Sequence, residues 1–244
     1  MLSYSSGVAE PPLLTETIGD NLARTVERFG DHEALVECAT GRRWTYAEFH
    51  EATRRIATAL LQRGIGPGDR VGIWSPNTAE WAMVQYATAQ IGAILVTINP
   101  AYRTEELEYV LNQSSIAMVL SAASFKTSDY TAMLDAVRDR CPNLHDVVIV
   151  GSPEWSAIAE TAADDGALQD VQSRLRPSDP INIQYTSGTT GFPKGATLTH
   201  LNIGNNGYVV GEGLGYTEAD RVCIPVPFYH CFGMVMGNLA CTSH

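Results

Sequence analysis

Residues Ile181–Thr199 read INIQYTSGTTGFPKGATLT. The stretch opens with isoleucine, isoleucine and tyrosine at alternate positions, which is typical of a half-buried strand. Its last five residues, Gly195–Thr199, also have the composition of a strand. Between these ends, Thr186–Gly195 contains four hydroxyl side chains, three glycines and one lysine. The pattern predicts a strand, a special loop and a second strand.

Each residue type in this loop suits a polyphosphate. Glycines let backbone N–H groups approach an anion, hydroxyls donate to phosphate or ligate Mg²⁺, and lysine supplies a point charge. Lys194 is the only formally charged residue between Asp179 and Glu212. The loop is no Walker A motif, because two residues separate Gly191 from Lys194, and it is not GxGxxG. Composition alone also permits a flexible surface loop.

On the N-terminal side of this loop, the sequence alternates between amphipathic helices and short apolar strands. Helices are expected to begin near Thr45-x-x-Glu48, Asn77-x-x-Glu80 and Thr104, and a further one spans 131–140. Glu33–Trp44 predicts a hairpin. Strands are predicted at 71–74, 94–98, 116–120 and 147–150. This rhythm predicts an α/β fold with a layered, mostly parallel sheet flanked by helices. We place a boundary near Asp179, which gives segments 1–179 and 180–244.

Composition narrows the function. The chain has 244 residues and a net charge of −11, which argues against binding to nucleic acid or to an anionic membrane. Its five cysteines form no CxxC pair, so neither a disulfide framework nor a zinc knuckle is expected. We found no signal peptide pattern and no apolar stretch of transmembrane length. These features favour a cytoplasmic protein.

The loop resembles a known signature. YTSGTTGFPKGA at Tyr185–Ala196 matches the phosphate loop of the adenylate-forming superfamily, [ST]-S-G-[ST]-T-G-x-P-K-G, at every constrained position. TYAEF at Thr45–Phe49, GDRVGI at Gly68–Ile73 and IGAILVTINP at Ile91–Pro100 resemble other family elements in order and spacing. PFYHCFG at Pro227–Gly233 resembles the element that follows the loop, and its form is most similar to the fatty-acyl-CoA synthetase branch.

The resemblance implies an ATP-dependent fatty-acid–CoA ligase, with ATP, Mg²⁺ and coenzyme A as co-substrates and a fatty acid as the activated carboxylic acid. Lys194 and His230 would be catalytic, with Lys194 on the leaving pyrophosphate and His230 near the carboxylate. Thr190 is the candidate for contact with Mg²⁺. Phe228, Tyr229, Phe232, Met234 and Met236 are candidates for an acyl tunnel or for ordinary core packing. The residues expected to bind ATP are Thr186, Ser187, Gly188, Thr189, Thr190, Gly191, Phe192, Pro193 and Lys194.

The chain departs from the family in length. Family segments that bind Mg²⁺ and ribose, the hinge and the C-terminal lobe with its lysine find no match in this sequence. We therefore expect an N-terminal fragment, truncated in its second sub-lobe and inactive by itself. Two alternatives stay open: a non-catalytic nucleotide-binding or interaction module, and a superfamily member that activates an aryl or amino acid. The oligomeric state is also left open.

Overall fold

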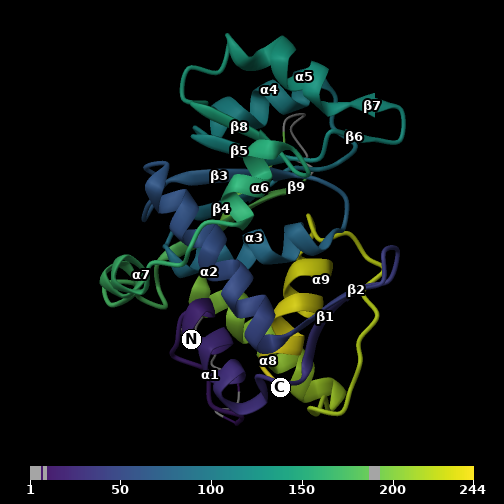
Figure 1. Cartoon of the computed structure of the whole chain (residues 1–244). Helices are drawn as coiled ribbons and strands as arrows, with labels where there is room; N and C mark the ends of the chain where they lie inside the picture. The colour runs from purple at the N-terminus through teal and green to yellow at the C-terminus, as the bar shows by residue number, and fades with distance from the viewer. Residues whose placement is uncertain (1–6, 8–9, 187–192) are drawn as a thin grey trace, which may run out of the picture.

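A six-stranded sheet forms the centre of the molecule (Figure 1). The computed structural model describes residue 7 and residues 10–186 and 193–244. Five strands are parallel neighbours and the edge strand β10 runs antiparallel to β9. The order is β10 (Lys194–Thr199), β9 (Pro180–Thr186), β4 (Ile94–Thr97), β3 (Arg70–Trp74), β5 (Met118–Ser121) and β8 (Asp146–Ile149). The predicted fold class is confirmed.

Helices cover both faces of this sheet (Figure 1). Alternate side chains of one strand enter different cores: Met118 and Leu120 pack with α2 and α3, whereas Val119 packs with α4 and α5. This follows from the two-residue period of a strand. The covering helices are α1 (Ile18–Phe29), α2 (Tyr46–Gln62), α3 (Ala79–Gln90), α4 (Thr104–Gln113), α5 (Tyr130–Arg138), α6 (Pro153–Ala159) and α7 (Asp165–Gln172).

Two of the three predicted helix starts need correction. Thr45 caps α2 as predicted, with its hydroxyl and Glu48 forming a capping box. The cap of α3 is Thr78 rather than Asn77, because the Asn77 amide binds a distant backbone segment instead. Thr104 is the first residue of α4, not its cap, and the Glu106 carboxylate accepts from the backbone N–H of Arg103.

Two small hairpins lie outside the central sheet. The predicted hairpin is present as β1 (Glu33–Glu37) and β2 (Arg42–Thr45), which pair antiparallel. A second pair, β6 (Ser124–Phe125) and β7 (Ser128–Asp129), precedes α5. The first hairpin borders the C-terminal part of the chain, which becomes important for the cavity described below.

The C-terminal part is helical and packs on the first part. It consists of α8 (His200–Leu214), α9 (Cys231–Gly233), the π-helix η1 (Met234–Leu239) and α10 (Ala240–Thr242). The Thr25 hydroxyl of α1 donates to the carbonyl of Thr242 at 2.6 Å. The proposed division near Asp179 stays a prediction, and the hydrogen bonds between β9 and β4 continue the sheet across it.

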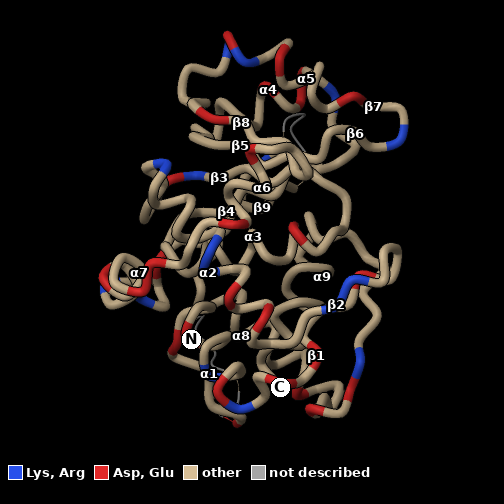
Figure 2. Tube along the Cα trace, viewed as in Figure 1, with Lys and Arg blue, Asp and Glu red and all other residues tan. Residues whose placement is uncertain are grey.

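Charges are distributed unevenly (Figure 2). Charged residues occur in helices, strands and turns along most of the trace, whereas residues 222–244 contain no Lys, Arg, Asp or Glu. Within the described residues, no helix combines the length and the apolar character that crossing a membrane requires.

Candidate functional site

The two ends of the predicted phosphate loop are held together by the sheet. Thr186, the last residue of β9, is the register partner of Lys194, the first residue of β10. The Thr186 hydroxyl also donates to the Lys194 carbonyl at 3.4 Å. Both residues are exposed. The six predicted site residues between 187 and 192 lie outside the described residues: Ser187, Gly188, Thr189, Thr190, Gly191 and Phe192.

Helix α4 anchors both strands that lead into and out of the loop. The Tyr109 hydroxyl donates to the carbonyl of Pro193 at 3.1 Å, and Gln113 Nε2 donates to the same hydroxyl at 2.7 Å. The hydroxyl of Tyr185 lies 2.7 Å from that of Ser114, directly after α4. Burial raises the pKa of Tyr185, so its hydroxyl is uncharged at neutral pH. These contacts place the loop ends on a rigid frame.

The glycine after Lys194 has a steric role that the sequence reading missed. Gly195 is the cross-strand partner of Tyr185. A Cβ atom at this position would lie 2.9 Å from Ile183 Cγ2 and 3.4 Å from Tyr185 Cζ. Glycine therefore leaves room for the Tyr185 ring that reaches Ser114. The glycine directly after Lys194 is visible in the sequence. The strand register is needed to show that it faces Tyr185.

His230 lies directly before α9 and caps it. Its Nδ1 accepts from the backbone N–H of Phe232 at 3.1 Å, which leaves the proton of the neutral imidazole on Nε2. The side chain is exposed, so this Nε2–H is available as a donor. Residues 221–230, which precede α9, form no strand, since no described segment pairs with them.

Two side-chain amides, one buried and one exposed, connect the His230 segment to the sheet. Gln184, two residues before Thr186, donates from Nε2 to the Tyr229 carbonyl at 2.6 Å, and its Oε1 accepts from Cys231 Sγ at 3.4 Å. Asn77, just after β3, binds the backbone of Val226 and Phe228. The carboxyl ends of β3 and β9 lie at one edge of the sheet, which is where ligands bind in open α/β folds. Sequence reasoning missed both amides.

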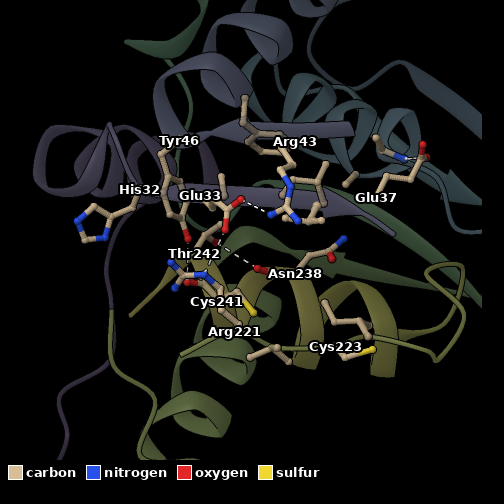
Figure 3. A pocket seen from close by; sticks show the side chains of 18 of the residues that line it. His32, Glu33, Glu37, Arg43, Tyr46, Arg221, Cys223, Asn238, Cys241 and Thr242 are labelled. Atoms are coloured by element: carbon tan, nitrogen blue, oxygen red, sulfur yellow. Dashed lines mark hydrogen bonds and ion pairs between the residues drawn. The ribbon is translucent and has the colours of Figure 1, made fainter. Parts of the chain in front are cut away.

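The five candidate acyl-tunnel residues differ in their surroundings. A cavity of about 620 Å³ lies between the β1–β2 hairpin and the C-terminal segment, and of the five only Phe228 lines it (Figure 3). Phe228 is 7% exposed and packs on Trp81, with ring centroids 5.4 Å apart. Phe232 is 53% exposed, whereas Met234 is buried in the core. Core packing thus accounts for Met234, and the acyl tunnel stays a prediction.

Figure 3 also shows charged groups at the rim of this cavity. Glu33 of β1 forms ion pairs with Arg43 of β2 and with Arg221, the latter at 3.6 Å. These pairs bridge the hairpin and the segment before α9. Arg43 beside it holds the pKa of the Glu33 carboxyl below its usual range.

A metal site is not formed by the described residues. They contain no group of three or more histidine, cysteine, aspartate or glutamate side chains able to hold a metal ion. The residue predicted to contact Mg²⁺, Thr190, lies outside the described part of the chain.

Comparison with known proteins identifies the family. A family model described as "AMP-binding enzyme" matches residues 22–244. Medium-chain acyl-CoA ligase ACSF2, mitochondrial, from Danio rerio is 41% identical over 259 residues, which covers 97% of this chain and 43% of that protein. The putative acyl-CoA synthetase YngI of Bacillus subtilis (strain 168) is 40% identical over 253 residues, covering 95% and 46%. This chain spans less than half the length of these two relatives.

Solved structures agree in fold. The inhibitor-bound N-terminal domain of FACL13 from Mycobacterium tuberculosis has a TM-score of 0.78 at 27% identity, covering 93% of this chain and 55% of that domain. A long-chain-fatty-acid-CoA ligase, FadD1 from Archaeoglobus fulgidus, has a TM-score of 0.84 at 24% identity, covering 99% and 48%. Since the family model covers most of the chain, this protein belongs to the AMP-binding enzyme family.

Proposed function

We propose that this chain supplies the N-terminal part of an AMP-forming acid–thiol ligase that activates a fatty acid. Such an enzyme first forms acyl-AMP and pyrophosphate from ATP, and then transfers the acyl group to coenzyme A. The observation that carries the proposal is the pairing of Thr186 with Lys194 at the carboxyl end of β9, beside the segment that bears His230. The names of the relatives, which are acyl-CoA ligases, support the choice of acid and thiol.

In this reaction a carboxylate oxygen attacks the α-phosphorus of ATP and the bond to the β-phosphate oxygen breaks, so that pyrophosphate leaves. We assign Lys194 to the charge on the leaving pyrophosphate, with the loop hydroxyls donating to the β- and γ-phosphates and the loop glycines giving backbone access. A net charge of −11 repels a triphosphate at long range, so local donors must hold it. Bound Mg²⁺, with Thr190 as the candidate protein contact, would neutralise further phosphate charge.

His230 is assigned to the carboxylate end of the substrate. A neutral imidazole that donates from Nε2 stabilises a carboxylate or acyl phosphate oxygen without a fixed charge. The N-cap hydrogen bond from Phe232 to Nδ1 supports this tautomer. The role of His230 does not depend on the six loop residues that lie outside the described part.

The proposal extends to the activity of the chain alone and to its cellular compartment. We propose that the chain alone does not turn over, since the relatives are more than twice as long. We also propose a reducing compartment, with the cytoplasm as the simplest one, because all five cysteines are free. The ACSF2 relatives are described as mitochondrial. A nucleotide-binding module without turnover and an aryl- or amino-acid-activating enzyme are the competing functions.

Calorimetric titration of the 244-residue chain with ATP and Mg²⁺ tests the loop assignment. We expect saturable binding that weakens about tenfold or more in Lys194→Ala, the loss typical of a hydrogen bond to a charged group. Lys126→Ala is the matched control, because Lys126 is the other of the two lysines and lies in the β6–β7 turn, at the Phe125 ring. Equal affinity in Lys194→Ala, or no binding in the wild type, would contradict the assignment.

Pyrophosphate exchange separates the remaining alternatives. We expect the purified chain to show ATP binding without exchange for any carboxylic acid. Exchange above background with a fatty, aryl or amino acid would refute inactivity and would name the acid class at the same time.

A further inference from the structure

The segment that carries His230 has few backbone partners of its own. Residues 221–230 belong to no helix or strand, and their own backbone hydrogen bonds include the one from the N–H of His230 to the carbonyl of Pro227 at 3.2 Å. Backbone groups that are removed from water need partners, because an unpaired one costs free energy comparable to a lost hydrogen bond. Phe228 is buried and Val226 and Tyr229 are half-buried, and side chains of other elements supply partners for the backbone groups of these three residues.

Asn77 supplies two of these partners on the side that precedes His230. Its Nδ2 donates to the Val226 carbonyl at 2.9 Å, and its Oδ1 accepts from the backbone N–H of Phe228 at 2.8 Å. The side chain thus binds the segment with both ends of its amide, as a neighbouring strand would. Asn77 follows β3, so the contact fixes the segment against the carboxyl edge of the sheet.

Gln184 supplies two partners on either side of His230. Its Nε2 donates to the carbonyl of Tyr229 at 2.6 Å, and its Oε1 accepts from the thiol of Cys231 at 3.4 Å. Gln184 is 5% exposed, so little water competes for these groups. Because the two residues that flank His230 are bound by one side chain of β9, the direction of the histidine is tied to the strand that ends at Thr186.

Gly233 permits a close backbone contact in the same region. A Cβ atom on Gly233 would lie 2.4 Å from the Pro227 carbonyl oxygen and 2.9 Å from the backbone nitrogen of Phe228. The first turn of α9 can therefore touch the Pro227–Phe228 backbone only without a side chain at position 233. This close approach keeps the N-terminus of α9, and with it the N–H of Phe232 that binds His230, in a defined place.

We infer that Asn77 and Gln184 are positioning residues that hold His230 with its Nε2–H directed away from α9, as a donor for the substrate. The inference rests on the proposed function for what His230 does, but not for how His230 is held. Neither amide needs to touch substrate. Their effect passes through the backbone at 226–231 to the N-cap hydrogen bond of His230.

Nuclear magnetic resonance of the ¹⁵N-labelled 244-residue chain tests this without nucleotide. Long-range ¹H–¹⁵N spectra above pH 8 report the tautomer of each neutral histidine, and the His230→Asn variant assigns the signal. We expect the Nε2–H form of His230 to predominate in the wild type. In Gln184→Glu and, separately, in Asn77→Asp, a carboxylate faces a carbonyl, and we expect the ratio of Nε2–H to Nδ1–H forms to fall about fivefold, as for loss of an ordinary N-cap bond.

Gln90→Glu is the matched control. Gln90 is also a buried amide, but it donates to the Thr53 hydroxyl at 2.7 Å and does not touch the His230 segment. An Nδ1–H or mixed tautomer of His230 in the wild type would overturn the inference. An unchanged tautomer ratio in whichever of the Gln184→Glu and Asn77→Asp variants stays folded would also overturn it. An equal change in Gln90→Glu would also overturn it, because that would indicate general loosening. Absence of ATP binding would instead count against the proposed function alone.

Discussion

His200 is a buried histidine at the start of α8, and it connects two distant parts of the chain. Its Nδ1 accepts from the backbone N–H of Ile18 at 3.1 Å, and its Nε2 has no hydrogen-bond partner among the described residues. Desolvation lowers the pKa of His200 to about 4, although Asp179 and Asp20 act in the opposite direction. Thr199 beside it caps α8, while the His200 side chain binds the backbone of α1.

The low pKa of His200 predicts that the folded protein loses stability in acid. The unfolded chain binds a proton at His200 near pH 6.5 and the folded chain only near pH 4, so protonation favours unfolding in that window. Stability is fully present above pH 6.5 and falls as the pH drops toward 4, by at most about 1.4 kcal/mol per pH unit. His200→Asn keeps an acceptor for Ile18, and urea unfolding at several pH values should show a shallower loss. Equal slopes in both proteins would disprove the assignment.

At the scale of elements, caps decide where helices begin. The Thr45 hydroxyl accepts from the backbone N–H of Glu48 at 3.2 Å, and Glu48 Oε2 accepts from the backbone N–H of Thr45 at 2.8 Å. Thr104 has a similar place in the sequence but lies inside α4. Both threonines stand where a helical pattern begins, but only Thr45 caps its helix.

A pair of substitutions tests this difference. Thr45→Ala removes a side-chain cap and should lower the free energy of unfolding by about 1 kcal/mol. Thr104→Ala removes no cap and should change it by less than about 0.5 kcal/mol. Urea unfolding followed by far-ultraviolet circular dichroism at pH 7 measures both. A comparable loss in the two variants would show that Thr104 also acts as a cap.

At the scale of the whole molecule, the C-terminal helices are joined to the first part by buried polar contacts. The Tyr86 hydroxyl lies 3.1 Å from the Asn238 carbonyl and 2.9 Å from the Thr242 hydroxyl, and Tyr86 is 1% exposed. Gln85 binds the carbonyl of Met234 and the amide of Asn238. Contacts of this kind couple residues on both sides of the predicted boundary near Asp179.

Tyr86→Phe tests this coupling. It removes one hydrogen-bond partner from buried groups of η1 and α10, which should cost about 1 kcal/mol. All four tryptophans precede residue 179, so fluorescence reports the first part and circular dichroism the whole chain. We expect one coincident urea transition by both probes, shifted to lower urea in the variant. Two separate transitions, or a shift in only one probe, would indicate two independent units.

A structural feature can be predicted from the sequence when the residues that cause it are close together in the chain. The strands of the central sheet, the β1–β2 hairpin and the Thr45 cap depend on neighbouring residues and agree with the sequence patterns within a few positions, whereas the short strands β6 and β7 were not predicted. Asn77 was assigned to the start of a helix because its spacing to Glu80 fits a capping box. Its amide instead binds Phe228, 151 residues away, and no local pattern signals such a contact.

Sequence patterns alone predict the alternating α/β architecture, and the phosphate-loop motif indicates the family. Both are readable from the sequence because periodicity and motif spacing are properties of short segments. The tertiary structure is needed to show which strands are neighbours and which side chains bind the segment of His230. It also shows why Gly195 and Gly233 have no room for a side chain. Those features arise where segments far apart in the chain meet, so their energies depend on packing that the linear order does not contain.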